Sequence, residues 1–194
     1  SITLNSKVFE SGTEITDEGN YILSVEAIDS LGQRSSKNLY FSIDMTSPKI
    51  SIQGFDEGQY LNKTITPEIS ITEQNPDTQT ISLNDTDYVI GTEITDEQNH
   101  TISVTVTDKA GNSKTVTKSF VIDLTPPDLA LNSPIEGIKL ADYSSNFTGS
   151  VSDVNFASLK LGDDIITESA GDFSFKESLK LEGENLFQLT AVDM

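Results

Sequence analysis

The stretch Tyr21-Ile-Leu-Ser-Val-Glu-Ala-Ile28 decides the fold of this chain. The residues at its alternate positions are apolar or aromatic: Tyr21, Leu23, Val25 and Ala27. Alternation with a period of two predicts a β-strand that turns one face toward a core. The same alternation returns later in the chain at His100, Ile102, Val104 and Val106. The core predicted for residues 46–125 consists of Ile69, Ile71, Leu83, Ile102, Val104, Val106, Phe120 and Ile122. We find no convincing run at helical spacing, so the sequence predicts an all-β protein.

The alternation returns because the sequence repeats itself. Residues 2–44 align without a gap with residues 81–123, 79 positions later, and share 18 identities among 43 positions. The run Gly12-Thr-Glu-Ile-Thr-Asp-Glu18 is identical to residues 91–97. A period near 80 residues is the length of a small domain and is too long for one turn of a solenoid. The chain is therefore predicted to be a tandem array of small modules.

Proline-containing segments mark the predicted boundaries between modules. The chain reads Ile43-Asp-Met-Thr-Ser-Pro48 and then Ile122-Asp-Leu-Thr-Pro-Pro127. Proline lacks an amide donor and restricts the backbone, which favours short and stiff linkers. We expect a complete module over 46–125 and a divergent third module over 126–194 that lacks its last strand. Residues 1–45 are expected to be a truncated module that forms only a partial sheet or is completed by material from elsewhere. Both ends of the sequence are expected to be cuts in a larger protein.

Composition limits the partners that this protein could have. The chain carries 31 acidic and 12 basic side chains, for a formal charge of −19. Nucleic acid and anionic membranes attract clustered Lys and Arg, so neither is an expected partner. The sequence contains no cysteine, which excludes disulfides and thiolate metal sites. No stretch approaches the ~20 apolar residues of a membrane span, so we expect no direct membrane insertion.

A family resemblance adds to this interpretation. The segment Asp17-Glu-Gly-Asn-Tyr-Ile-Leu23 resembles the tyrosine corner of immunoglobulin-like (Ig-like) folds. Together with a glycine turn and Phe41-x-Ile43-Asp44, it is similar to the bacterial Ig-like repeats of surface proteins and adhesins. Asp108-Lys-Ala-Gly-Asn112 is close to the usual turn of that family. The resemblance implies tandem Ig-like antiparallel β-sandwiches. His100 stands where the family has tyrosine, and we expect its ring nitrogen to reach a nearby backbone carbonyl.

The sequence favours a structural function over catalysis. It has one histidine, no cysteine and no glycine-rich phosphate loop. Paired carboxylates are common in it, but the insertions that build a pocket are missing. We therefore expect no enzyme activity, and predict spacer or stalk repeats of an extracellular bacterial cell-surface or secreted protein, adhesin-like in character. Two alternatives stay open: a module that binds a carbohydrate or host-protein ligand, and the accessory tail of a secreted hydrolase.

Calcium is a candidate cofactor at the junctions, weighed against a purely structural role for the same residues, and neighbouring repeats are the expected partners. In an Ig-like sandwich, the turns after the second and sixth strands face the preceding module, while the last strand ends at the opposite side. The residues expected to converge are Asp44, Glu73, Asp77, Asp108 and Asn112 at the first junction, and Asp123, Asp153 and Asp193 at the second. Calcium takes six to eight oxygen ligands, which such junctions supply. The alternative interpretation is that Asp and Asn lie there because they form good turns.

Overall fold

The computed structural model describes residues 1–135, 137, 144–178 and 183–194, and the regular structure in them is entirely β-strand. The prediction of an all-β protein is confirmed. In the part of the chain that is described, no helix is long and apolar enough to cross a membrane. The chain divides into two compact units. The first comprises Ser1–Gly54, Thr66–Thr92 and Thr101–Lys118, and the second comprises Phe55–Ile65, Glu93–His100 and Ser119–Met194.

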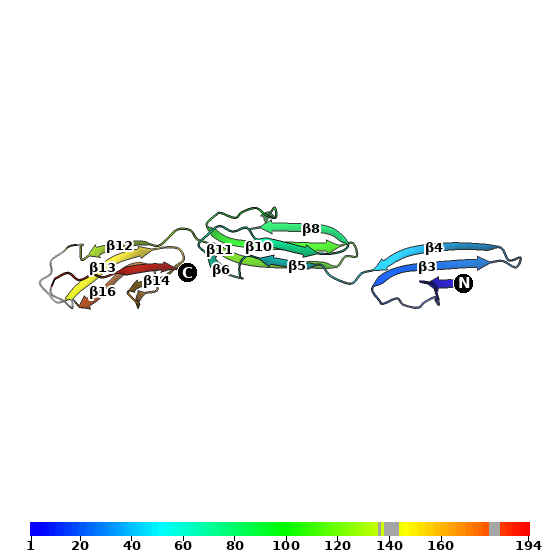
Figure 1. The fold of residues 1–194 in the computed structure, drawn as a ribbon, viewed down its shortest axis with the longest axis horizontal. Coiled ribbons are helices and arrows are strands. Elements are labelled where there is room, and N and C mark those ends of the chain that lie inside the picture. Colours follow the sequence, from blue (N-terminus) through cyan, green and yellow to red (C-terminus); the bar gives the residue numbers. More distant parts are fainter. Residues whose placement is uncertain (136, 138–143, 179–182) are drawn as a thin grey trace. The chain divides into compact units, whose positions relative to one another are not determined.

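In the first unit, residues 1–45 form one antiparallel sheet of four strands (Figure 1). The strand order is β2 (Lys7–Val8), β1 (Ile2–Leu4), β3 (Gly19–Ile28) and β4 (Arg34–Ile43). β3 and β4 form a long hairpin whose pairing runs from Gly19 opposite Ile43 to Ile28 opposite Arg34. Every residue from 1 to 45 is described, and none of them is fully buried. These residues therefore form a single layer.

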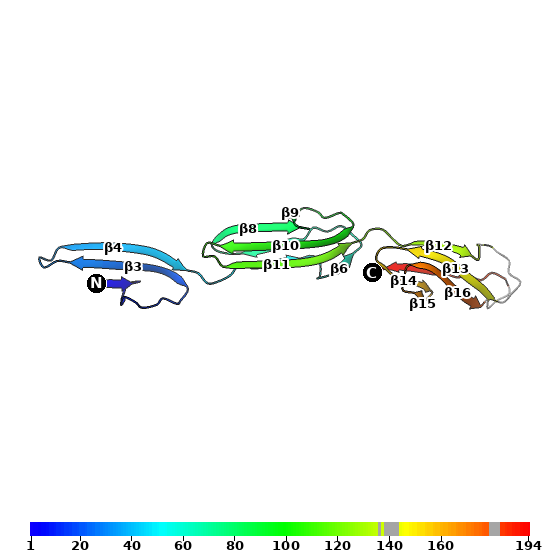
Figure 2. The same ribbon diagram turned by 180° about the vertical axis from the view of Figure 1, so that it is seen from behind.

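Residues 46–125 contribute two further sheets. β5 (Lys49–Gln53) pairs with β7 (Glu68–Thr72) in a two-stranded antiparallel sheet. A five-stranded sheet has the order β6 (Gln59–Leu61), β11 (Ser113–Ile122), β10 (Gln98–Asp108), β8 (Pro76–Leu83) and β9 (Thr86–Asp87), and Figure 2 shows β8, β10 and β11 along one another.

The side chains of these two sheets follow the alternation of the sequence. Five residues that the pattern placed in a core are at most 1% exposed: Ile102, Val104, Val106, Phe120 and Ile122. Three others that it placed there, Ile69, Ile71 and Leu83, are only half-buried.

The second unit also holds two three-stranded sheets. One has the order β12 (Asp128–Ser133), β13 (Ser144–Ser152) and β16 (Gly171–Ser178), and the other has the order β15 (Asp164–Thr167), β14 (Phe156–Leu161) and β17 (Leu189–Asp193). Their common core consists of Val151, Phe156, Leu159 and Phe173. Apolar side chains from both sheets thus pack together, which is consistent with a β-sandwich.

The predicted corner contact is present in both repeats. The Tyr21 hydroxyl donates to the carbonyl oxygen of Asp17 over 2.7 Å. At the equivalent position, Nε2 of His100 lies 2.8 Å from the carbonyl oxygen of Asp96. His100 is buried and stacks on Phe120 with 5.1 Å between the ring centroids. A histidine thus replaces the tyrosine with the same backbone partner.

Candidate metal centres

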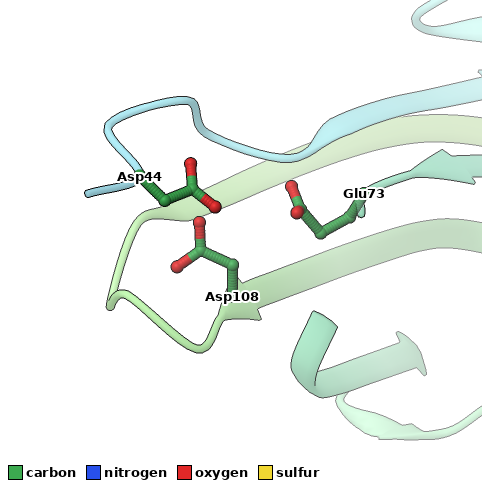
Figure 3. Close-up of side chains that lie close together, drawn as sticks. All are labelled: Asp44, Glu73 and Asp108. Carbon is green, nitrogen blue, oxygen red and sulfur yellow. The ribbon is translucent and has the colours of Figure 1, made fainter. Parts of the chain in front are cut away.

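Three carboxylates of the first unit converge where three strands end. Asp44 follows β4, Glu73 follows β7, and Asp108 is the last residue of β10. One oxygen from each of the three lies within 4.8 Å of the others. Figure 3 shows the three carboxylates turned toward a common centre. We call this group the first triad. Residues far apart in the sequence are brought together because strand ends on one side of the fold share one region of space.

Asp108 is the most rigidly held member of the first triad. It is only 2% exposed. Its Oδ1 accepts hydrogen bonds from the backbone amides of Ala110 and Asn112, over 2.9 and 2.8 Å. Burial alone raises the pKa of Asp108, but these bonds and the bond from the Asn112 side chain outweigh it and hold the pKa below its usual value. Asp108 is therefore an ionised carboxylate with a fixed orientation.

Two asparagines connect the first triad. Nδ2 of Asn112 donates to Oδ2 of Asp108 over 2.8 Å and to the carbonyl oxygen of Asp44 over 2.9 Å. Nδ2 of Asn75 donates to Oδ2 of Asp44 over 3.2 Å. The backbone amide of Asn75 also donates to Oε1 of Glu73 over 2.8 Å. These donors are neutral, so they orient the carboxylates without offsetting their charge.

The second unit contains an equivalent group, which we call the second triad. Asp123 follows β11, Asp153 follows β13, and Asp193 is the last residue of β17. Their oxygens also lie within 4.8 Å of one another. Nδ2 of Asn155 donates to Oδ2 of Asp123, and its backbone amide donates to Oδ1 of Asp153 over 2.7 Å. The second triad thus repeats the element positions and the asparagine of the first.

Asp193 differs from its counterpart Asp108. Its Oδ1 is buried and has no hydrogen-bond partner among the described residues. Burial raises the pKa of Asp193 to about 6, and the nearby carboxyls of Asp153 and Asp123 add to this effect. A buried oxygen without a donor, beside two other carboxylates, is an arrangement that a cation would stabilise.

The sequence identified most of these residues but missed two. Asp44, Glu73, Asp108 and Asn112 come together as expected, and so do the three aspartates of the second triad. Asp77, also expected near the first junction, is exposed on β8 and does not belong to the triad. The residues missed are Asn75 and Asn155. Their signal was an acidic residue followed two positions later by asparagine, which occurs in both modules directly after a strand.

The two triads offer only oxygen ligands. Carboxylate, carbonyl and water oxygens suit hard cations such as calcium, magnesium and manganese. They do not provide the thiolate ligands that select copper and zinc. Either triad could therefore hold a metal ion. A comparison with models of protein families matched none of them, and a comparison with curated proteins found no match. The geometry of the triads is thus the main guide to function.

Proposed function

We propose that this chain consists of tandem Ig-like repeats that act as a spacer in a bacterial cell-surface or secreted protein, with calcium bound at each triad. The proposal is supported first by the sequence, which repeats a domain-sized segment and joins the modules by short proline linkers. It is supported second by the all-β architecture, with the corner contact present in both repeats.

The observation that carries the proposal is the recurrence of the triad. Asp44 and Asp123 occupy equivalent positions in the repeat, and each begins a proline linker. The backbone amide two residues further on, Thr46 or Thr125, donates to Oδ1 of the aspartate over 3.2 Å in both cases. Unpaired carboxylates repel one another, so two groups of three carboxylates favour a bound cation at each of them.

A cation in the triad would connect a linker to the module that follows it. In the first unit, Asp44 ends the sheet of residues 1–45, whereas Glu73 and Asp108 belong to strands within 46–125. An ion shared by these residues would restrain the linker between Asp44 and Pro48. The protein would thus gain stiffness at a short proline segment only when calcium is present, which is the behaviour expected of an extracellular spacer.

Calcium fits these triads better than magnesium. Three carboxylates bind through one or both oxygens, and water completes the six to eight ligands that calcium accepts in irregular geometry. Magnesium demands near-ideal octahedral geometry and gives up its water reluctantly. The triads are built from side chains on separate strand ends, which favours the more adaptable ion.

Calorimetric titration of the purified chain tests the proposal. We expect two calcium ions to bind, one for each triad. Asp44→Asn should abolish or strongly weaken the first site only, and Asp123→Asn the second site only. Asp172→Asn, at an exposed position on β16, is the matched control and should keep both. Absence of calcium binding at millimolar concentrations would refute the metal sites.

Small-angle scattering tests the spacer function separately. Calcium should narrow the distribution of interatomic distances in the intact chain, and the double variant Asp44→Asn/Asp123→Asn should not respond. If calcium binds but leaves the scattering profile unchanged, the triads are metal sites that do not stiffen the linkers. The spacer proposal would then lose its mechanism.

A further inference from the structure

One face of the sheet formed by residues 1–45 is apolar and uncovered. Directly paired residues of an antiparallel sheet lie on the same face. The register gathers Lys37, opposite Val25, and a set of apolar side chains on one side: Ile2, Leu4, Leu23, Val25, Leu39 and Phe41. We call this the apolar face. Within it, Val25 is 42% exposed and Leu39 is 59% exposed. Contiguous exposed apolar side chains of this kind mark a surface that another element covers.

The second repeat shows what these positions do in a complete module. Leu23 aligns with Ile102, and Val25 aligns with Val104. Both Ile102 and Val104 are 0% exposed. The sequence pattern of the strand is the same in the two repeats, so the difference in exposure comes from what lies against it. The apolar face is a core surface without its second layer.

The opposite face of the same sheet carries more polar side chains, together with the exposed Ile22, Ile28 and Tyr40. It carries the ion pair between Arg34 and Glu26, in which Nη1 lies 2.8 Å from Oε1. The hydrogen bond from Arg34 lowers the pKa of Glu26, which keeps this carboxylate charged. At the equivalent position in the second repeat, Thr105 shares a hydrogen bond with Thr115 across the strands. In both repeats, therefore, polar pairs lie on the solvent side of the sheet, and the apolar face is the side that a core would cover.

The segment that completes the second module is known from the repeat. Residues 46–79 carry β5, β6 and β7 and come before the strands that repeat residues 1–45. Ile52 of β5 is 4% exposed and Leu61 of β6 is 6% exposed. Their apolar side chains form part of the core, which the sheet of residues 1–45 lacks.

We propose that the apolar face docks a β-segment with the sequence pattern of residues 46–79. The occupant is a further repeat segment of this kind that packs against the apolar face as a second layer, because both edges of β1 already pair with β2 and β3. In the alignment, Ser1 corresponds to Thr80, and β1 corresponds to the end of β8, which the chain reaches directly from β7. The added segment would therefore precede the strands of residues 1–45 in the same way as residues 46–79 precede the strands that repeat them. This inference makes no use of the triads, so it stands or falls apart from the proposed calcium sites.

The test is a fusion in which a second copy of residues 46–79 is joined directly ahead of Ser1. The chain contains no cysteine, so a single introduced cysteine reports accessibility without background. Val25→Cys probes the apolar face, and Tyr40→Cys, on the opposite face and 69% exposed, is the matched control. We expect the fusion to slow thiol labelling at residue 25 by at least about tenfold and to leave labelling at residue 40 within about twofold.

A second fusion supplies the negative control. In it, the added copy carries serine in place of its four core isoleucines, those that correspond to Ile50, Ile52, Ile69 and Ile71, and it should give no protection. Amide hydrogen exchange of β3 in the cysteine-free fusion should slow in parallel, which shows docking even if a cysteine variant folds poorly. Unchanged exchange and labelling in the fusion would overturn the proposal. So would protection at residue 25 in the unfused chain that appears only with dimer formation, because a second copy would then cover the face.

Discussion

Replacing Asp193 by asparagine should stabilise the metal-free protein and weaken calcium binding at the same time. Asparagine keeps an oxygen at the same place but removes one of three negative charges from the second triad. The remaining carboxylates, Asp123 and Asp153, then repel each other alone. Higher stability without metal and weaker calcium binding are expected together only if the fold holds the three carboxylates close despite their repulsion. The experiment therefore tests whether this repulsion is present.

The magnitude follows from the geometry. Two unit charges at the limiting separation of 4.8 Å repel by about 0.9 kcal/mol in water and about 3.5 kcal/mol at an effective dielectric constant of 20. The raised pKa of Asp193, from 3.8 to about 6, corresponds to roughly 3 kcal/mol before screening by solvent is considered. Because Asp193 is only half-buried, we expect a gain of roughly 1–2 kcal/mol in chelator at neutral pH.

The same group predicts how stability depends on pH. An acid whose pKa is raised on folding holds its proton more tightly in the folded state than in the unfolded chain. Without metal, its stabilising contribution is therefore complete below the unfolded value of 3.8 and is lost as the pH rises through about 6. The Asp193→Asn variant should lack this loss, so the difference in Tm between variant and parent should grow across that interval.

The assay is thermal unfolding in chelator and in calcium, followed by circular dichroism. In chelator the variant should melt several degrees above the parent, since about 1 kcal/mol corresponds to roughly 2–4 °C for a chain of this size. In calcium at a hundredfold excess over Kd the second triad of the parent should contribute a gain of about 2.7 kcal/mol, and that of the variant clearly less. Asp172→Asn should change neither value. A variant that melts below its parent in chelator would refute the reasoning about repulsion.

Three further outcomes are expected from other parts of the fold. Gly149→Ala should destabilise the second unit by about 1–3 kcal/mol in chemical unfolding, because a Cβ there would lie 2.2 Å from the carbonyl oxygen of Ala130 and 2.5 Å from the ring of Phe173. His100→Ala should cost roughly 1–3 kcal/mol in the same measurement, whereas His100→Tyr should be neutral or stabilising, since Tyr21 makes the equivalent contact. Asn155→Ala should weaken calcium binding at the second triad in calorimetry without affecting the first, because it frees Asp123 from its amide donor.

Much of the fold follows from the sequence because alternation is a local property. The positions of Ile102, Val104 and Val106 in a core could be predicted from their spacing alone, and all three are buried. The half-burial of Ile69 and Leu83 could not be predicted in this way. Alternation tells which face of a strand a side chain is on, but not how much of that face the neighbouring segments cover. Exposure depends on contacts between distant segments, which a single sequence does not specify.

The triads show the same division between local and distant information. Asp44 and Asp108 were predicted to meet because both end strands, and strand ends converge in a sandwich. Asn75 was missed because its role depends on the direction of one side chain, which donates to Asp44 from a position 31 residues further along the chain. Only the second copy, in which Asn155 makes the same bond, shows that the contact is a feature of the repeat.

Asp108 and Asp193 occupy equivalent positions, but their pKa values are shifted in opposite directions. Asp108 accepts hydrogen bonds from the turn that follows it, and these donors stabilise its charge before any ion arrives. Oδ1 of Asp193 is buried without such a donor, and its pKa moves in the opposite direction. Because the first triad is already oriented, calcium binding there should change the local structure little. The second triad should respond more to a cation. The ion would take the place of the missing hydrogen-bond donors and offset the repulsion between the carboxylates. Calcium should therefore protect the amides of β17 from hydrogen exchange more than those of β10, and equal protection at both strands would show that the donors of the turn do not set the response.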